Sequence, residues 1–195
     1  MTLIETERLR IRELVEADLD ALAAILGDRE TMRFYRRPWS RDDVRAWIER
    51  NRRSYEAHGF GVWALELTAT GELAGDCGLL VQHVDGRDEV EIGYHVKREL
   101  WRQGLATEAA CAAREYAFGR AGVTRVVSLI TPENLPSQGV ARKVGMRLEK
   151  EVVWHDRPVL VFALERPREP EAEPEPGGEA PASPRSAGAS LEQPP

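Results

Sequence analysis

The stretch from Val90 to Ala110 constrains the fold of this chain more than any other, because it changes from strand to helix across one short loop. In its first part, β-branched Val90, Ile92 and Val96 alternate with polar or small residues, a pattern typical of a strand. After Trp101–Gly104, apolar and small residues recur every three to four positions, a pattern typical of a helix. The sequence therefore predicts a strand, a short loop and a helix in direct succession.

A loop that opens a helix in this way is a candidate phosphate site. The first N–H groups of a helix have no partner within it, and the helix dipole favours negative charge at that end. Gly104 and Ala106 let an anion approach the backbone closely, and Lys97, Arg98 and Arg102 add positive charge. We therefore expect a phosphate-bearing ligand at this loop.

Periodicity, capping residues and turn residues predict the other elements. Besides the central strand at 90–96, strands are expected at 9–12, 59–67, 72–80, 125–131, 147–154 and 159–164. Helices are expected at 16–26, after an N-cap at Ser40 with Asp43 in a capping box, from Leu105 to a stop at 119–122, and from Pro136 to Lys143. A polar loop is expected at 83–88. This order predicts an α+β domain with a mixed, mostly antiparallel sheet of six to seven strands and about four helices.

The composition predicts one domain at 6–166 and a disordered tail at 167–195. The tail holds 8 of the 12 prolines, with six acids against two arginines, so it cannot bury enough apolar surface to fold. It carries four of the six net negative charges, which leaves the domain nearly neutral and disfavours nucleic-acid binding. Without a membrane span or a signal peptide, a cytoplasmic location is expected.

Two motifs resemble those of the GNAT N-acetyltransferases. The family's pyrophosphate loop reads Gln/Arg-x-x-Gly-x-Gly/Ala, and this chain has Trp101-x-x-Gly104-x-Ala106. An aromatic residue at the first position is usual in the RimJ/RimL-type branch of the family, so this loop resembles those ribosomal-protein N-acetyltransferase-like members. The segment from Asn134 to Met146 is similar to the family's N-x-x-S-x-x-x-x-x-K-x-G-F pattern. The order of elements over 6–165 also matches, so the resemblance implies a GNAT fold with a splayed central strand pair.

The resemblance further implies acetyl-CoA as cosubstrate and direct acetyl transfer to a primary amine, either a protein N-terminal α-amine or a small-molecule amine. Backbone groups of the central strand would bind the pantetheine arm, and N–H groups of the loop would bind the pyrophosphate. The implied cofactor-binding residues are Tyr94, His95, Val96, Trp101, Arg102, Gln103, Gly104, Leu105, Ala106, Thr107, Asn134 and Ser137. No metal is expected. Cys77 and Cys111 match no nucleophile position of the family, so no acyl-enzyme is expected.

Two catalytic residues follow from the same resemblance. Glu91 matches a strand position where family members place a general base, and its apolar surroundings can raise its pKa. A salt-bridged structural role is the alternative for Glu91, and Glu89 on the same face is the competing base. The family's usual acid, a tyrosine seven residues after the motif asparagine, is replaced by Ala141, so Ser137 is assigned to the departing thiolate.

The acceptor region is less constrained by sequence. Phe34, Tyr35 and Trp39 are predicted either to line the acceptor pocket or to pad the core under a loop. Nearby arginines either attract an acidic peptide or form a solvated face: Arg33, Arg36, Arg37, Arg41 and Arg45. Trp154, expected to be exposed on a late strand, hints at a homodimer. The alternative function is a non-catalytic acyl-CoA-binding or sensing module, which the missing tyrosine favours.

Overall fold

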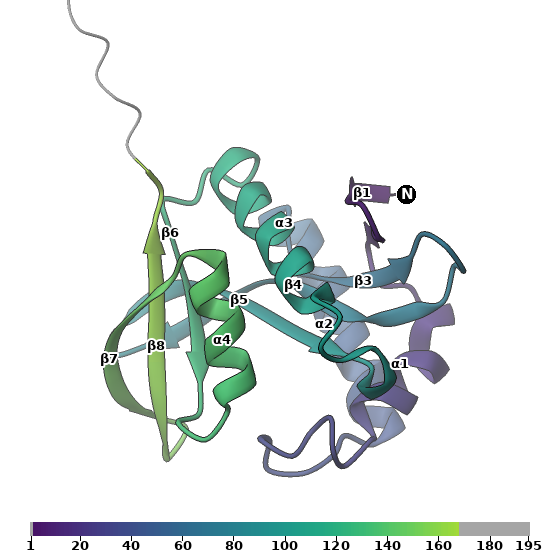
Figure 1. Cartoon of the computed structure of the whole chain (residues 1–195), viewed down its shortest axis with the longest axis horizontal. Coiled ribbons are helices and arrows are strands. Elements are labelled where there is room, and N and C mark those ends of the chain that lie inside the picture. Colours follow the sequence, from purple (N-terminus) through teal and green to yellow (C-terminus); the bar gives the residue numbers. More distant parts are fainter. Residues whose placement is uncertain (1, 168–195) are drawn as a thin grey trace, which may run out of the picture.

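The computed structural model describes residues 2–167, so the predicted tail lies outside the described residues, apart from its first proline. Eight strands form one sheet in the order β1-β2-β3-β4-β5-β6-β8-β7 (Figure 1). The strands are β1 (Thr2–Glu5), β2 (Leu9–Arg12), β3 (Val62–Leu67), β4 (Leu73–Val84), β5 (Arg87–Val96), β6 (Arg125–Ile130), β7 (Arg147–Trp154) and β8 (Arg157–Glu165). The α-helices are α1 (Leu19–Leu26), α2 (Arg41–His58), α3 (Leu105–Gly119) and α4 (Leu135–Val144), with 3-10 turns at Glu16–Asp18 and Arg98–Leu100.

The predicted α+β class and mixed, mostly antiparallel sheet are confirmed, with one strand more than expected. That strand, β1, is only four residues long and pairs with β2 at the edge of the sheet. The prediction of a polar loop at 83–88 is wrong, because β4 and β5 run on to a tight turn at Asp85 and Gly86, where φ is +51° and +80°. Polar side chains follow this hairpin end because most of it is solvent-exposed, and this hides the strand pattern.

Helix α2 begins where the sequence predicts, but it runs up to Gly59, so the strand expected at 59–67 starts only at Val62. The Ser40 hydroxyl accepts the backbone N–H of Asp43 at 3.2 Å, and the Asp43 carboxylate accepts the Ser40 N–H at 2.7 Å, which completes a capping box. Gly59 ends the helix with φ +73°, a conformation that favours glycine. The buried side chains of Trp47 and Ile48 fix which face of α2 meets the sheet.

The helices cover the two faces of the sheet. Helices α1 and α2 enclose one core cluster against β3 and β4, and α2 lies behind the sheet in Figure 1. Helices α3 and α4 enclose the larger cluster on the other face, with Trp63 and Phe162 among its largest buried side chains. Within residues 2–167, no helix is long and apolar enough to cross a membrane.

The central strands β5 and β6 separate, as predicted. They are parallel neighbours with one register pair, Glu91 with Val127, whereas β4 and β5 share ten pairs. Beyond the pair the sheet opens, and only side-chain hydrogen bonds such as Ser128 Oγ to the Ile92 carbonyl, at 2.8 Å, join the two strands. This opening positions the candidate site.

Candidate active site

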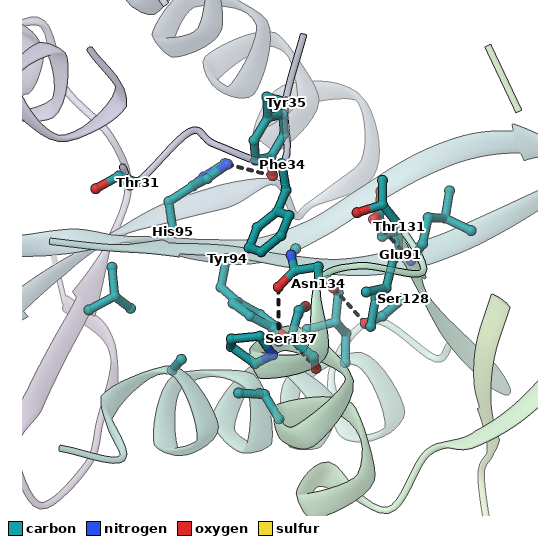
Figure 2. A pocket seen from close by; sticks show the side chains of 18 of the residues that line it. Thr31, Phe34, Tyr35, Glu91, Tyr94, His95, Ser128, Thr131, Asn134 and Ser137 are labelled. Carbon is teal, nitrogen blue, oxygen red and sulfur yellow. Dashed lines mark hydrogen bonds between the residues drawn. The ribbon is translucent and has the colours of Figure 1, made fainter. Parts of the chain in front are cut away.

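A cavity of about 1280 Å³ lies where β5 and β6 separate. Its wall comes from β5, β6, α2, the start of α3, α4, the segment 28–39 and the β7–β8 hairpin. Figure 2 shows wall residues from β5, the end of β6, the segment 28–39 and α4. Pockets for one small ligand usually enclose about 300–1,000 Å³. The volume and the many contributing elements indicate room for two ligands that meet at β5.

Strand β5 divides this cavity into two sides, because alternate residues point to opposite faces of a sheet. Ile92 packs in the core under α3, and Tyr94 contacts α4. Glu91 and His95 point to the opposite face, where His95 contacts Asp76 beneath α2. We call these the α3/α4 side and the α2 side.

Glu91 is a half-buried carboxylate on the α2 side. Its Oε2 accepts the Gln82 side-chain amide at 2.8 Å, and its Oε1 accepts the Leu129 backbone N–H at 3.3 Å. Burial raises the pKa of Glu91, although both hydrogen bonds and the charges of His95 and Arg50 oppose the shift. A carboxylate with a raised pKa is suited to accept a proton near neutral pH.

Glu89 lies in a different environment, although it is only two residues away on the same strand. It is 6% exposed, and its carboxylate pairs with Arg125 at 3.1 Å and with Arg87 at 2.6 Å. Two guanidinium groups therefore neutralise it, which is a structural role. Between the two candidate bases, the geometry favours Glu91.

On the α3/α4 side, Tyr94 and Ser137 form a pair of hydroxyl groups (Figure 2). The two oxygens are 2.7 Å apart, and the Tyr94 hydroxyl also lies 3.1 Å from the Ser137 carbonyl, so its single proton can be donated to either Ser137 oxygen. Asn134 caps α4 by accepting the Ser137 N–H at 3.2 Å, which fixes the serine at the start of the helix. The sequence predicts a role for the backbone of Tyr94 but not for its side chain, although the alternation of β5 places that side chain on the face covered by α4.

Ala141, the position of the family's usual tyrosine, packs inside the core under α3 and is 1% exposed. No larger side chain fits there without displacing its neighbours. The Tyr94 hydroxyl reaches Ser137 from β5 instead, so the cavity still contains a tyrosine hydroxyl beside the motif serine.

His95 is part of a hydrogen-bonded chain on the α2 side. Its Nδ1 lies 2.7 Å from Asp76, and its Nε2 lies 2.7 Å from the Tyr35 hydroxyl (Figure 2). The second oxygen of the fully buried Asp76 accepts the indole N–H of Trp47 at 2.9 Å. Tyr35 is 44% exposed, yet its hydroxyl turns inward to His95, and burial of that hydroxyl raises the pKa of Tyr35. This series of hydrogen bonds connects the 28–39 segment to the sheet.

All three predicted acceptor residues, Phe34, Tyr35 and Trp39, line the cavity. Trp39 also packs against the core cluster of α1 and α2, as the core-padding alternative expects. That these residues bind an acceptor stays a prediction.

The loop before α3 has the geometry of an anion site. Gly104 has φ +86° at the N-cap of α3, and Arg102 has φ +61°. The Trp101 indole donates to the Val96 carbonyl at 2.7 Å, which joins the loop to β5. The cavity wall includes nearly all the predicted loop residues: Trp101, Arg102, Gly104, Leu105, Ala106 and Thr107. Gln103 differs, because its side-chain amide donates to the Glu99 carbonyl at 3.3 Å.

The five arginines singled out in the sequence fall into two groups. Arg33, Arg36 and Arg37 line the cavity. Arg41 and Arg45 pair instead with Asp20 and Asp42, at 2.8 Å and 2.7 Å. The second group is therefore a solvated, ion-paired face.

Three further observations concern the remaining predictions. Cys77 is buried, and burial raises the pKa of its thiol, so it is a poor nucleophile. Among residues 2–167, no group of three or more His, Cys, Asp or Glu could hold a metal ion. The prediction of an exposed Trp154 is wrong, since it is half-buried and its indole donates to the His83 carbonyl at 2.9 Å. The homodimer therefore stays a prediction without support from that residue.

Comparison with known proteins agrees with this geometry. A model of the acetyltransferase (GNAT) domain matches residues 8–147. Uncharacterized protein YkkB of Bacillus subtilis is 32% identical over 162 residues, which cover 83% of this chain and 94% of that protein. The structure of an acetyltransferase from Agrobacterium tumefaciens has TM-score 0.74 and 25% identity, and the match covers 84% of this chain and 94% of that one. RimL, a ribosomal L7/L12 α-N-protein acetyltransferase solved with coenzyme A, shares the fold with TM-score 0.71 and 18% identity over 85% of this chain and 98% of that one. This chain therefore belongs to the GNAT family and is an acetyltransferase.

Proposed function

We propose that the protein is an N-acetyltransferase that moves the acetyl group of acetyl-CoA directly to a primary amine, with Glu91 as the general base. The observation that carries the proposal is the position of Glu91: a half-buried carboxylate with a raised pKa, on the wall of a two-sided cavity, where β5 and β6 separate. The acceptor is either a protein N-terminal α-amine or a small-molecule amine.

Acetyl-CoA supplies an activated thioester, and the residues of the α3/α4 side fit it. After its one register pair, β5 has no strand partner toward β6, so its backbone can pair with the amides of a pantetheine arm. The Thr131 hydroxyl, which follows β6 and lies beside Glu91 in Figure 2, is a buried polar atom without a hydrogen-bond partner in the described part of the chain. A polar ligand in the opening would satisfy that hydroxyl. The N–H groups around Gly104 would hold the pyrophosphate.

The proposed reaction has one proton transfer on each side of β5: the amine loses a proton on the α2 side, and the thiolate gains one on the α3/α4 side. The neutral amine attacks the thioester carbonyl from the α2 side, and Glu91 takes the amine proton, directly or through a water. The carbon–sulfur bond then breaks, and the Ser137 hydroxyl donates a hydrogen bond to the sulfur as it becomes a thiolate. When Tyr94 donates to Ser137 Oγ, the serine proton is free to point toward the sulfur. The thiolate takes its proton from solvent through this pair.

A non-catalytic acyl-CoA-binding module is the second candidate. It was favoured by the missing tyrosine, and the Tyr94–Ser137 pair weakens that argument because it brings a tyrosine hydroxyl to the same place. Such a module would need no carboxylate with a raised pKa on the acceptor side.

Thermal unfolding with acetyl-CoA, CoA and ATP, together with CoA release in the presence of an amine panel, tests the proposal. A ligand at a hundredfold excess over its Kd stabilises the folded state by about 2.7 kcal/mol. We expect stabilisation by both CoA species, none by ATP, and CoA release that depends on an amine. Stabilisation without CoA release would indicate a binding module, and no stabilisation by either CoA species would contradict the loop assignment.

A further inference from the structure

The α2 side of the cavity is positively charged. Six arginines line it, contributed by the 28–39 segment, α2 and the β7–β8 hairpin: Arg33, Arg36, Arg37, Arg50, Arg53 and Arg157. Two of them are neutralised locally, since Arg33 pairs with Glu30 and Arg37 with Asp43. Four guanidinium groups then face one remaining carboxylate, that of Glu91. Arg102 and Lys143 also line the cavity, and Arg33 lies over the ring of Trp101 in the loop before α3, 5.6 Å from its centroid.

Arg50 is held in place without using its hydrogen-bond donors. Its guanidinium lies over the Trp47 ring, 4.4 Å from the centroid, and the Trp47 indole is fixed by its hydrogen bond to buried Asp76. Arg50 and Glu91 both line the cavity. Burial lowers the pKa of Arg50, and the charge of Glu91 opposes that shift. Among residues 2–167, Arg50 has no ion pair and no hydrogen-bonded carboxylate.

Two other arginines of the cavity wall join separate parts of the chain. Arg36 donates to the His155 carbonyl at 2.7 Å, and Arg157 donates to the Phe34 carbonyl at 3.3 Å. These bonds join the 28–39 segment to the β7–β8 hairpin across the cavity. Both guanidinium groups use backbone acceptors, so their positive charge is not cancelled.

This charge has opposite effects on an amine acceptor. Nearby positive charge lowers the pKa of a bound ammonium group and so favours the neutral amine that the reaction needs. The same charge repels a cationic acceptor before it binds. An acceptor with a carboxylate beside its amine avoids that repulsion, because the planar fork of an arginine binds a carboxylate through two parallel hydrogen bonds.

Given the proposed function, we infer that the acceptor carries a carboxylate close to its primary amine, and that Arg50, positioned on Trp47, binds this carboxylate while Glu91 receives the amine proton. Acceptors with several positive charges are disfavoured by the same arrangement. An amino acid and a peptide with an acidic second residue share this chemistry.

Matched acceptors test the inference. One pair is Ala-Asp amide and Ala-Asn amide, which share the α-amine and differ in one carboxylate. The other pair is alanine and alaninamide, for which kcat/KM is calculated from the concentration of the neutral amine. We expect kcat/KM to be about tenfold or more higher for the acidic member of at least one pair, and the pair that shows this identifies the source. Equal kcat/KM within both pairs would overturn the inference.

Three variants assign the effect to Arg50. In Arg50→Gln, the ratio of kcat/KM for the acidic acceptor to kcat/KM for its neutral match should be close to one. Arg50→Lys keeps the positive charge but loses the planar guanidinium, so it should give an intermediate ratio. Arg52→Gln is the matched control, because it makes the same change two residues away on α2, outside the cavity wall. It should leave the ratio unchanged. A ratio that survives in Arg50→Gln would contradict the assignment.

The inference and the proposed function can fail separately. Turnover of amines with no preference for a carboxylate overturns the inference alone. If no amine is turned over, a binding measurement still tests the inference. In the presence of CoA, the N-acetylated forms of the acidic acceptors should raise the unfolding temperature more than those of the neutral acceptors do. Equal shifts would then overturn the inference too.

Discussion

The Glu91 carboxylate on β5 accepts the backbone N–H of Leu129 on β6, with 3.3 Å between N and Oε1. This bond spans the strands just after their one register pair, at the place where the sheet opens. It holds the carboxylate at the boundary between the two sides of the cavity. The proposed general base is thus fixed by the same divergence that would admit the thioester.

Replacing Glu91 should remove the base and leave the cosubstrate site intact. We expect Glu91→Gln to lower kcat by about 10²–10⁴-fold, the usual contribution of a general base, with CoA affinity unchanged. Steady-state kinetics and CoA titration measure the two effects. A variant with full kcat would contradict the assignment.

The raised pKa of Glu91 also predicts a pH dependence. The base acts when deprotonated, so kcat at saturating acceptor should fall as the pH drops through a pKa above the ordinary glutamate value. This fall of kcat at low pH should be missing from the pH profile of the residual activity of Glu91→Gln. Glu89→Gln is the control, because it removes a buried charge that pairs with Arg87 and Arg125. It should lower the free energy of unfolding, while the fall of kcat at low pH remains.

The Tyr94–Ser137 pair should act as one unit. Tyr94→Phe and Ser137→Ala should each lower kcat, and the double variant should lose little more than the larger single loss, because the 2.7 Å contact couples the two hydroxyl groups. A double-mutant cycle on kcat measures the coupling. Losses that simply multiply would show that the two hydroxyls act independently.

Gly104 should be needed for the loop before α3. At φ +86°, any other residue is strained by about 1–2 kcal/mol, and a Cβ would lie 3.3 Å from the Arg8 guanidinium. We expect Gly104→Ala to lower both the free energy of unfolding and the affinity for CoA. In Gly119→Ala a Cβ meets nothing within 4 Å, so this control should keep both. Equal CoA affinity in the two variants would contradict the anion site.

Asp76 should matter for stability and for the position of Tyr35. Asp76→Ala leaves the Trp47 indole and His95 without their buried acceptor, and each such loss costs about 1–3 kcal/mol. Urea denaturation measures this loss. If the His95–Tyr35 bond positions the 28–39 segment, His95→Phe should raise the acceptor KM more than it lowers kcat. A change in kcat alone would point to a chemical role for His95 instead.

Much of the fold could be predicted because its signals are local. Alternation predicts β5, the Ser40–Asp43 capping box predicts the start of α2, and the turn at Gly71 separates β3 from β4. The polar end of the β4–β5 hairpin could not be predicted in the same way. In the stretch 83–88 every residue except Val84 is solvent-exposed, so no apolar periodicity marks it.

The site was less predictable because its partners come from distant parts of the chain. Glu89 and Glu91 are equivalent in the sequence, and the ion pairs of Glu89 with Arg87 and Arg125 distinguish them in the structure. Arg50 and Asp76 carry no motif, and their positions depend on Trp47, a residue that sequence periodicity assigns only to the core.

The most direct measurement is mass spectrometry of the protein and an acceptor panel after incubation with acetyl-CoA. Direct transfer at Glu91 predicts an N-acetylated acceptor, an unmodified protein, and loss of the product in Glu91→Gln. An acetylated protein that passes its acetyl group to the acceptor, or undiminished product with Glu91→Gln, would contradict the account.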